Sequence, residues 1–304
     1  MKKKKAVSKE AKLTKVILES AFDIAEKLKV KETFVFATDQ LLQDTNQFIE
    51  QMEKVDALLV VRGEKQMEQF SGRLSKVLKI PDVALSRMNQ IKVAVMLALS
   101  SGLIEQGDKI VCVTGVIALG FNDTVVVIDT GIEFEIFSSA NLVDISKMVR
   151  PDVFETVLKL SMELANQGRE GRAVGTIFVL GDDEKVLQLS RQIIINPFKG
   201  YSEEELSIHD PELREAIKEF SVIDGAFVIR GDGVLLTAGR HLNAAVEGEN
   251  LPQGLGSRHM AAAGITSLTD SIAIVISEST GSVRIFKKGN IFMEIERLSI
   301  GPWR

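Results

Sequence analysis

The chain has 304 residues, of which 45% are hydrophobic and 26% charged, and its formal net charge at pH 7 is −5. This is the composition of a folded globular protein long enough for two domains, and it excludes a chain that is disordered over most of its length. The negative net charge argues against broad nucleic-acid binding, which needs a basic surface, so we expect no nucleic-acid partner.

The first half alternates predicted helices with apolar strands. Helices are predicted over 13–28 and 89–104, strands over 33–37, 57–61, 109–114 and 124–129, and a further helical stretch between the first two strands. Such alternation indicates an α/β layer with a mainly parallel sheet. Gly115–Gly120 has the glycine spacing of a phosphate-binding loop, but Phe121-Asn122 stands where a lysine and a hydroxyl are needed, which favours an ordinary loop.

A polar segment at 138–141 predicts a boundary between two domains, which we place at 1–145 and 146–304. In the second domain, helices are predicted from Pro151 to 167, over 184–195, from Pro211 to Asp224 and after Gly256, and strands over 173–180, from Asp224 to 229, and over 234–238, 271–276 and 283–287. The second domain is therefore predicted to be a mixed sheet flanked by helices.

The cysteine content and the hydropathy of the sequence bear on where the protein works. Cys112 is the only cysteine, which fits a reducing compartment, and it lies in an apolar run that favours a buried side chain. No apolar run reaches the ~20 residues that a membrane-spanning helix needs, and the lysines at 2–5 are not followed by an export segment. We therefore expect a cytoplasmic protein with no membrane partner.

Three polar side chains of the second half have ordinary explanations. Asp182 and Asp183 could hold a metal, but their place just before a predicted helix favours a capping role in its first turn. His209 precedes Asp210-Pro211 at another helix start, and we interpret it as a surface or capping residue.

The strongest chemical pattern begins with Gly254-Leu255-Gly256. Ser257, Arg258 and His259 follow, and then an alanine-rich run that predicts a helix. The unpaired N–H groups of a helix start favour an anion, and a guanidinium adds charged donors, so we expect a phosphate site here. A purely structural helix cap is the alternative.

Two acidic groups stand beside glycines at predicted strand ends. Asp224-Gly225-Ala226 opens one apolar strand, and Ser277-Glu278-Ser279-Thr280-Gly281 follows another. Carboxylates in such places can hold a metal ion next to a phosphate site. The alternatives are an aspartate that accepts hydrogen bonds from strand-start amides and a solvated glutamate at a hairpin turn.

Taken in order, these three motifs resemble those of the diadenylate cyclases. The DGA motif of that family corresponds to Asp224-Gly225-Ala226, its GTRHR-type motif to Gly256-Ser257-Arg258-His259-Met260, and its Ser-Glu-rich strand end to 277–281. The likeness extends back through 170–179 and 196–201, so it covers roughly the last half of the chain. The first half resembles, more loosely, the C-terminal α/β domain of pyruvate kinases, which we take as a likeness of fold without transferred activity.

The resemblance implies an enzyme, a nucleotidyltransferase that condenses two ATP into cyclic di-AMP and releases two pyrophosphates. Each 3′-hydroxyl would attack the α-phosphorus of the other ATP in line, with a divalent metal neutralising charge. It implies catalytic roles for Asp224, Arg258 and His259, and metal ligation by Asp224 and Glu278, with Mn²⁺ expected and Mg²⁺ or Co²⁺ as alternatives. The implied nucleotide-contacting residues are Gly225, Ala226, Leu242, Gly256, Ser257, Arg258, His259, Ser277 and Glu278.

Three positions need comment beside the family pattern. Ser257 stands where many members have threonine, which keeps the hydroxyl, but Met260 replaces the last arginine of the motif. The missing charge would have to come from Arg240, Arg284 or a partner subunit. His241 precedes Leu242, which matches a leucine that contacts adenine in members of the family. Our own hypothesis is that the ring of His241 stacks on the adenine base.

The chain carries one copy of the motif set, while the reaction needs two nucleotides. The resemblance therefore implies a homo-oligomer with at least one face-to-face catalytic dimer. The first domain could hold chains together and regulate how often such faces meet, or it could bind a small allosteric ligand. A different function for the whole chain is that of an ATP or cyclic-dinucleotide sensor with weak or no catalysis.

Overall fold

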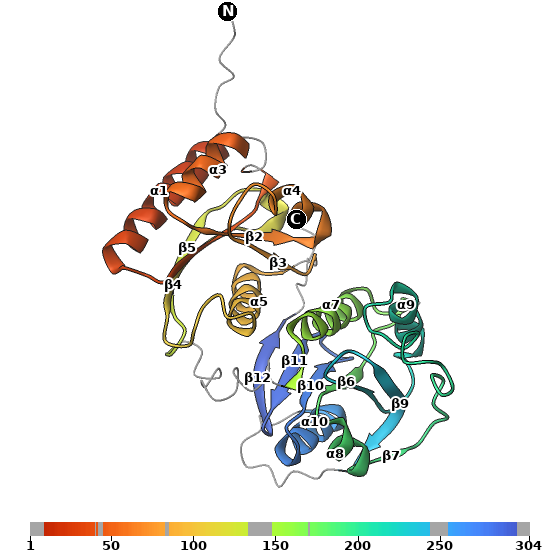
Figure 1. The fold of residues 1–304 in the computed structure, drawn as a ribbon. Helices are drawn as coiled ribbons and strands as arrows, with labels where there is room; N and C mark the ends of the chain where they lie inside the picture. Colours follow the sequence, from red (N-terminus) through yellow and green to blue (C-terminus); the bar gives the residue numbers. More distant parts are fainter. Residues whose placement is uncertain are drawn as a thin grey trace, which may run out of the picture. The chain divides into compact units, whose positions relative to one another are not determined.

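The computed structural model describes residues 9–39, 41, 45–82, 85–132, 148–169, 171–243 and 255–296. The chain separates into two compact units, 1–138 and 139–304 (Figure 1), and each unit contains one sheet. The predicted boundary at 145/146 falls in the stretch 133–147, which lies outside the described residues.

The sheet of the first unit has five strands in the order β3-β2-β1-β4-β5. They are β1 (Glu32–Phe36), β2 (Leu58–Arg62), β3 (Val77–Ile80), β4 (Lys109–Thr114) and β5 (Thr124–Asp129). The first four run parallel and β5 pairs antiparallel with β4, which confirms the predicted, mainly parallel α/β layer. The strands β1, β2 and β4 follow apolar runs that become buried on both faces, as parallel sheets require, whereas the edge strands β3 and β5 are buried only in part.

Helices cover both faces of this sheet (Figure 1). They are α1 (Lys9–Leu28), α3 (Thr45–Lys54), α4 (Gly63–Phe70) and α5 (Arg87–Ser100), and a short 3₁₀ turn, η1 (Ile117–Leu119), follows β4. Leu18 and Ala21 of α1 share a core with Met52 of α3 and Val35 of β1. Cys112 of β4 is fully buried, and burial raises the pKa of its thiol, so it is an inert core residue as predicted.

The sheet of the second unit has seven strands in the order β12-β11-β10-β6-β8-β9-β7. They are β6 (Thr176–Leu180), β7 (Ser190–Gln192), β8 (Ala226–Ile229), β9 (Leu235–Leu242), β10 (Ile272–Ile276), β11 (Val283–Lys287) and β12 (Asn290–Ile295). The pair β6 and β8 is parallel and the other pairs are antiparallel, which confirms the predicted mixed sheet.

The helices of the second unit are α7 (Pro151–Gln167), α8 (Asp183–Gln188), α9 (Pro211–Phe220) and α10 (Ser257–Leu268). Ala262, Ala263 and Ile265 of α10 pack against the sheet in one apolar core. Figure 1 shows α7 on the opposite face of this sheet, where it contacts β10 and β11. The alanines matter because small side chains bring α10, and the residues at its start, close to the strands.

Two local predictions in this unit are wrong. The helix expected over 184–195 ends at Gln188, because β7 then pairs antiparallel with the end of β9. Asp182 is the N-cap residue of α8 by position, but its side chain makes no capping hydrogen bond and instead accepts one from the amide of Asp270 at 2.8 Å. In both cases a partner distant in sequence overrides the local pattern.

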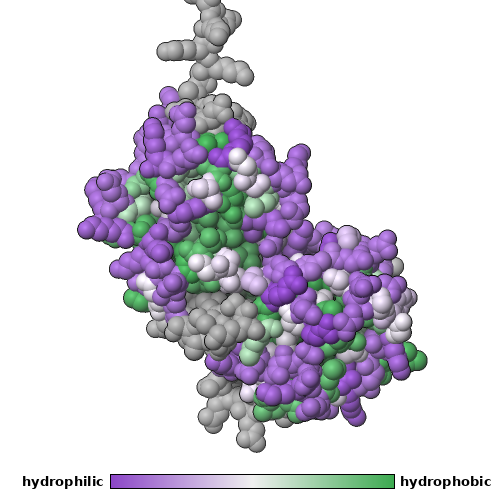
Figure 2. All heavy atoms as spheres, in the orientation of Figure 1, coloured by the Kyte–Doolittle hydropathy of each residue, from purple (hydrophilic) through white to green (hydrophobic). Residues whose placement is uncertain are grey.

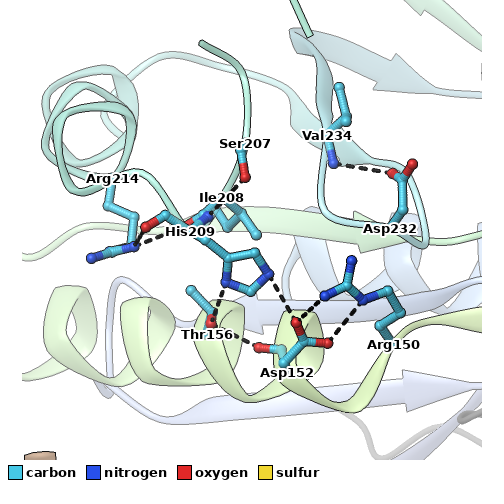
Figure 3. A network of polar contacts seen from close by, with 9 residues as sticks. All are labelled: Arg150, Asp152, Thr156, Ser207, Ile208, His209, Arg214, Asp232 and Val234. Atoms are coloured by element: carbon cyan, nitrogen blue, oxygen red, sulfur yellow. Dashed lines mark hydrogen bonds and ion pairs between the residues drawn. The ribbon is translucent and has the colours of Figure 1, made fainter. Parts of the chain in front are cut away.

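His209 belongs to a structural network at the start of α7, as Figure 3 shows. Its Nε2 lies 3.1 Å from Oδ2 of Asp152, its Nδ1 lies 3.5 Å from Oγ1 of Thr156, and Arg150 pairs with the same aspartate at 2.5 Å. Arg214 of α9 donates to the carbonyl of His209 at 2.6 Å. This network connects the loop before α9 to α7, in keeping with the predicted surface role of His209.

Hydrophilic side chains cover most of the visible face of the second unit, while an apolar area is visible on the first (Figure 2). Among the described residues, no helix is both long and apolar enough to pass through a bilayer.

Candidate active site

The side chain of Arg258 joins two carboxylates that the sequence places in separate motifs. Its Nη1 lies 3.0 Å from Oε2 of Glu278, and its Nη2 lies 3.8 Å from Oδ1 of Asp224. Three groups predicted to act together therefore meet at one guanidinium. Asp224 is 82% exposed, so the meeting point lies at the surface and is open to a ligand.

Sheet pairing explains why these motifs converge. In the register of β6 with its neighbours, Ile177 lies opposite Ala226 of β8, and Thr176 opposite Ile276 of β10. Because β8 is parallel to β6 and β10 is antiparallel, the starts of β6 and β8 and the end of β10 share one edge of the sheet. The two carboxylates flank these strand ends, and α10 begins at the same edge.

A cavity of about 900 Å³ opens beside Arg258. Its polar lining includes Arg172, Ser257, Arg258, His259, Ser277, Glu278, Ser279, Thr280, Arg284 and Glu294. Pockets for small ligands and cofactors occupy roughly 300–1,000 Å³, so this cavity has room for a nucleotide. Asp224 is not among the described lining residues and reaches this site through Arg258.

The start of α10 supplies unpaired amides to this cavity. The helix begins at Ser257 with Gly256 as N-cap, and no side chain caps it. The first backbone hydrogen bonds are donated by His259 and Met260 to the carbonyl of Gly256, which leaves the amides of Ser257 and Arg258 at the open end. This is the arrangement expected of an anion site; Gly254 itself lies outside the described residues.

His259 is 6% exposed and is held as a neutral ring. Its Nε2 lies 2.9 Å from Nη1 of Arg284, and a guanidinium only donates, so Nε2 accepts and Nδ1 carries the proton. Nδ1 is buried and has no partner among the described residues. Burial, assisted by the charge of Arg284, lowers the pKa of His259 to about 4, so this side chain acts at neutral pH without a charge of its own.

Comparison with known proteins identifies the families that the two halves of the chain match. Residues 163–291 match the family described as DisA bacterial checkpoint controller nucleotide-binding, and residues 13–137 match the probable sensor domain DacZ_P. A diadenylate cyclase of Haloferax volcanii is 36% identical over 208 residues, which are 68% of this chain and 75% of that protein. The chain belongs to the diadenylate cyclase family.

Other relatives are similar over part of their length. A diadenylate cyclase of Methanocaldococcus jannaschii is 39% identical over 201 residues, which are 66% of this chain and 63% of that protein, so the match spans less than two thirds of it. Among solved structures, DacA from Staphylococcus aureus, a double mutant, is 21% identical, with a TM-score of 0.32 over 49% of this chain and 87% of that chain.

The cyclase motif glycine Gly225 has a structural reason that the sequence does not reveal. Its φ is +102°, and a Cβ there would lie 2.6 Å from the backbone N of Arg240 and 2.6 Å from the carbonyl carbon of Gly239. Close approach of β9 therefore requires a glycine here, and the nucleotide contact that the family resemblance implies for Gly225 stays a prediction. Gly256, by contrast, has a φ of −74° and no described atom within 4 Å of the position that a Cβ would take, so none of the described residues requires a glycine there.

Four other predicted nucleotide contacts are divided between the core and the surface. Ala226 and Leu242 are buried in the core that α10 covers, where both side chains pack against apolar neighbours. His241 is exposed on β9, and successive strand residues face opposite sides, so it does not lie with Leu242. Ser277 is 5% exposed, and its hydroxyl lies 3.2 Å from that of Ser279 in the turn after β10.

Arg240 and Arg284 are the two arginines of this chain that could replace the charge missing at Met260, and the structure gives them different roles. Arg240 donates through Nε to the hydroxyl of Ser190 at 2.9 Å and through Nη2 to the carbonyl of Leu187 at 2.7 Å, so its guanidinium holds α8 and β7 together. Arg284 lines the cavity, whereas Met260 is not among the described lining residues. Within one chain, Arg284 is therefore the candidate that the geometry favours.

The carboxylate pair fits a metal ion only with help from a ligand. Carboxylate oxygens suit hard divalent cations, and Asp224 and Glu278 lie close enough to contact one guanidinium. The described residues contain no group of three or more histidine, cysteine, aspartate or glutamate side chains that could hold a metal. A cation here would therefore complete its coordination with water and phosphate oxygens, as Mg²⁺ commonly does.

Gly175, just before β6, is a site residue that the motif analysis did not single out. A Cβ there would lie 2.7 Å from Nη1 of Arg258 and 2.9 Å from Cβ of Glu278. The missing side chain leaves room for the guanidinium of Arg258 beside the start of β6. Its position between a charged stretch and an apolar strand gave no indication of this contact.

Replacing Gly175 with alanine is expected to displace Arg258, because its Nη1 is the end of a flexible side chain that can move aside. The new Cβ would also press on Cβ of Glu278, which is attached to the backbone, so the turn after β10 is expected to shift as well. We expect kcat/KM for ATP to fall roughly 10- to 100-fold, the usual cost of a misplaced catalytic group. Steady-state kinetics of the purified variant measure this. Gly72→Ala, where a Cβ meets nothing within 4 Å, is the control; wild-type kinetics in Gly175→Ala would contradict the prediction.

Acid is expected to destabilise the second unit through His259. The pKa of about 4 in the folded chain lies below the ordinary value of 6.5, so the unfolded chain binds more protons between these pH values. Stability should therefore fall as the pH falls through this window, by up to about 3 kcal/mol. Calorimetric unfolding from pH 7 to 4.5 tests this, and His259→Gln, which keeps an acceptor for Arg284, should flatten the dependence. Equal slopes in both proteins would contradict it.

Proposed function

We propose that this protein is a diadenylate cyclase, which condenses two ATP into cyclic di-AMP and releases two pyrophosphates. The observation that carries the proposal is the meeting of Asp224, Arg258 and Glu278 beside a cavity of about 900 Å³. Family membership supports it, and two relatives named as diadenylate cyclases are 39% and 36% identical to this chain over 66% and 68% of its length.

The roles of the three groups follow from their chemistry. Arg258 and the free amides at the start of α10 are donors for phosphate oxygens. Asp224 is the exposed carboxylate that takes the proton from the attacking 3′-hydroxyl, holds the metal, or does both. A phosphate that binds Arg258 competes with both carboxylates, so nucleotide entry releases Asp224 and Glu278 for these tasks.

We further propose that Asp224 and Glu278 hold a divalent cation, Mn²⁺ in the first place, with Mg²⁺ or Co²⁺ as alternatives. Such an ion neutralises charge on the phosphates as pyrophosphate leaves. Ser257 lies at the helix start and Ser279 and Thr280 at the turn after β10, so their hydroxyls flank the same cavity. His241, exposed at the end of β9, is our candidate for stacking on adenine.

Catalysis requires two copies of the chain. One chain carries one such site, and each 3′-hydroxyl has to reach the α-phosphorus of the other nucleotide. We therefore propose a face-to-face homodimer, in which the sites of two chains meet, with the first unit regulating or assembling the chains. The match of residues 13–137 to a probable sensor domain supports the regulatory alternative.

The proposal is tested by incubating the purified full-length chain with ATP and Mn²⁺, Mg²⁺, Co²⁺ or EDTA. Chromatography should show one cyclic di-AMP and two pyrophosphates for every two ATP consumed, and none with EDTA. The rate per chain should rise with protein concentration at low concentration, because two chains must meet. Binding of ATP without product under every metal condition would overturn the proposal and identify a sensor.

A further inference from the structure

We propose that Arg284 is a polyphosphate-binding residue of this cavity, and that His259 and Glu294 are positioning residues that aim its guanidinium. The inference rests on the proposed function in one respect only, which is that the polyphosphate is the tail of ATP. It assigns to β11 and β12 a part of the binding site that none of the three sequence motifs contains.

The first step is the placement of Arg284. It lies on β11, directly opposite Glu294 of β12 in the strand register, and both residues line the cavity. Its Nη2 is 2.5 Å from Oε1 of Glu294, and its Nη1 is 2.9 Å from Nε2 of His259. Strand β12 and helix α10 thus hold the two terminal nitrogens of the guanidinium in place, which reduces the entropy cost of binding a ligand through Arg284.

The second step is a count of donors. A guanidinium has five N–H donors, and the contacts to Glu294 and His259 use two of them. Nε is buried and has no partner among the described residues. The side chain remains 16% exposed, so its terminal nitrogens border the cavity with donors to spare. A fixed cation with unused donors at a cavity wall is suited to phosphate oxygens.

The third step concerns His259. Glu294 already offsets much of the charge of Arg284, and a second carboxylate in place of His259 would make this cluster negative, whereas a neutral ring that accepts through Nε2 holds the guanidinium without adding negative charge. Arg258 approaches the cavity from α10 and Arg172 lines it from the segment before β6. Three guanidiniums on three elements therefore surround the space in which we place the polyphosphate.

The test uses inorganic tripolyphosphate, which needs no catalysis, and isothermal titration calorimetry of the full-length chain in EDTA. Arg284→Gln should weaken binding roughly tenfold, the size of one charge-assisted contact. The control is Arg230→Gln, because Arg230 is also held by two side chains, in its case Glu203 and Asp232, and does not line the cavity. An affinity of Arg284→Gln within twofold of the wild type would overturn the proposal, as would absence of binding to the wild type.

The positioning role is read by NMR. The chain has three histidines, so long-range ¹H–¹⁵N spectra can resolve each ring. We expect His259 to carry its proton on Nδ1 in the wild type and to lose this preference in Arg284→Gln; an Nε2 proton in the wild type would overturn the positioning role. If Arg284→Gln does not fold, Arg284→Lys replaces it, since lysine keeps the charge but not the fork, and severalfold weaker binding is expected.

The cyclase activity and the polyphosphate-binding role of Arg284 are refuted by different results. Tripolyphosphate binding that depends on Arg284, without formation of cyclic di-AMP, would support this site while refuting the cyclase. Cyclic di-AMP formation with tripolyphosphate binding that is unchanged in Arg284→Gln would do the reverse. If the protein is a cyclase, Arg284→Gln should raise KM for ATP roughly tenfold with a smaller change in kcat. The reason is that Arg284 binds the polyphosphate of ATP and not the reacting atoms.

Discussion

Asp224→Asn is expected to reduce cyclic di-AMP formation roughly 10²- to 10⁴-fold, the range for loss of a catalytic acid–base group. Asparagine keeps the size of the side chain but can neither accept the proton of the attacking hydroxyl nor contribute a charged oxygen to a metal. The fold should be unaffected, because the side chain is 82% exposed and, among the described residues, pairs with Arg258 at 3.8 Å. An exposed pair of this kind contributes about 0–1 kcal/mol.

Product formation and thermal unfolding of the same preparation measure the two halves of this prediction. Asp183→Asn makes the same chemical change in the first turn of α8 and should leave the activity at the wild-type level. Asp224→Asn with activity within tenfold of the wild type would show that this carboxylate is not catalytic. A large drop in unfolding temperature would show instead that Asp224 has a structural role that its exposure does not reveal.

The asparagine variant also separates nucleotide binding from chemistry. Arg258 loses one of its two acidic partners, while its contact with Glu278 at 3.0 Å remains. The guanidinium is then less strongly held by carboxylates, so ATP binding in the absence of metal should be equal to that of the wild type or tighter. A variant that binds ATP and forms no product is the result that only a catalytic role predicts.

The strands that the sequence missed all lie at sheet edges, although one edge strand, β5, was predicted. The sequence predicted the bounds of β4, β5, β10 and β11 within one residue, because each is an apolar run between polar or glycine-rich turns. It missed β7 and β12, the two edge strands of the second sheet, and β3, an edge strand of the first. Their residues take strand geometry from a neighbour that the local sequence does not specify.

The candidate site shows the same division. Asp224, Arg258 and Glu278 were predictable because their residue types and order carry the chemistry, and sheet pairing brings them together. The state of His259 was not predictable, because its acceptor role depends on Arg284, which is 25 residues further along the chain. Gly175 was missed for a related reason, since its contact is with a side chain on another element.

Gly225→Ala is expected to destabilise the second unit by about 2–6 kcal/mol, in contrast to the substitution of its neighbour Asp224. Its φ of +102° is one that side-chain-bearing residues rarely adopt, which costs about 1–3 kcal/mol. The new Cβ would also lie 2.6 Å from backbone atoms of Gly239 and Arg240, and overpacking of this kind costs about 1–3 kcal/mol more. Backbone cannot move aside as the end of a side chain can, so β9 would have to shift.

Calorimetric unfolding of the full-length chain measures this loss, and activity should fall with the folded fraction. Gly256→Ala is the matched control in the same unit, because a Cβ there meets nothing within 4 Å and the φ of −74° is ordinary. The control should cost less than about 1 kcal/mol, the usual difference between glycine and alanine at a helix N-cap. If Gly225→Ala and the control lost the same free energy of unfolding, β9 would not constrain this position. A nucleotide contact would then be the remaining explanation for the glycine.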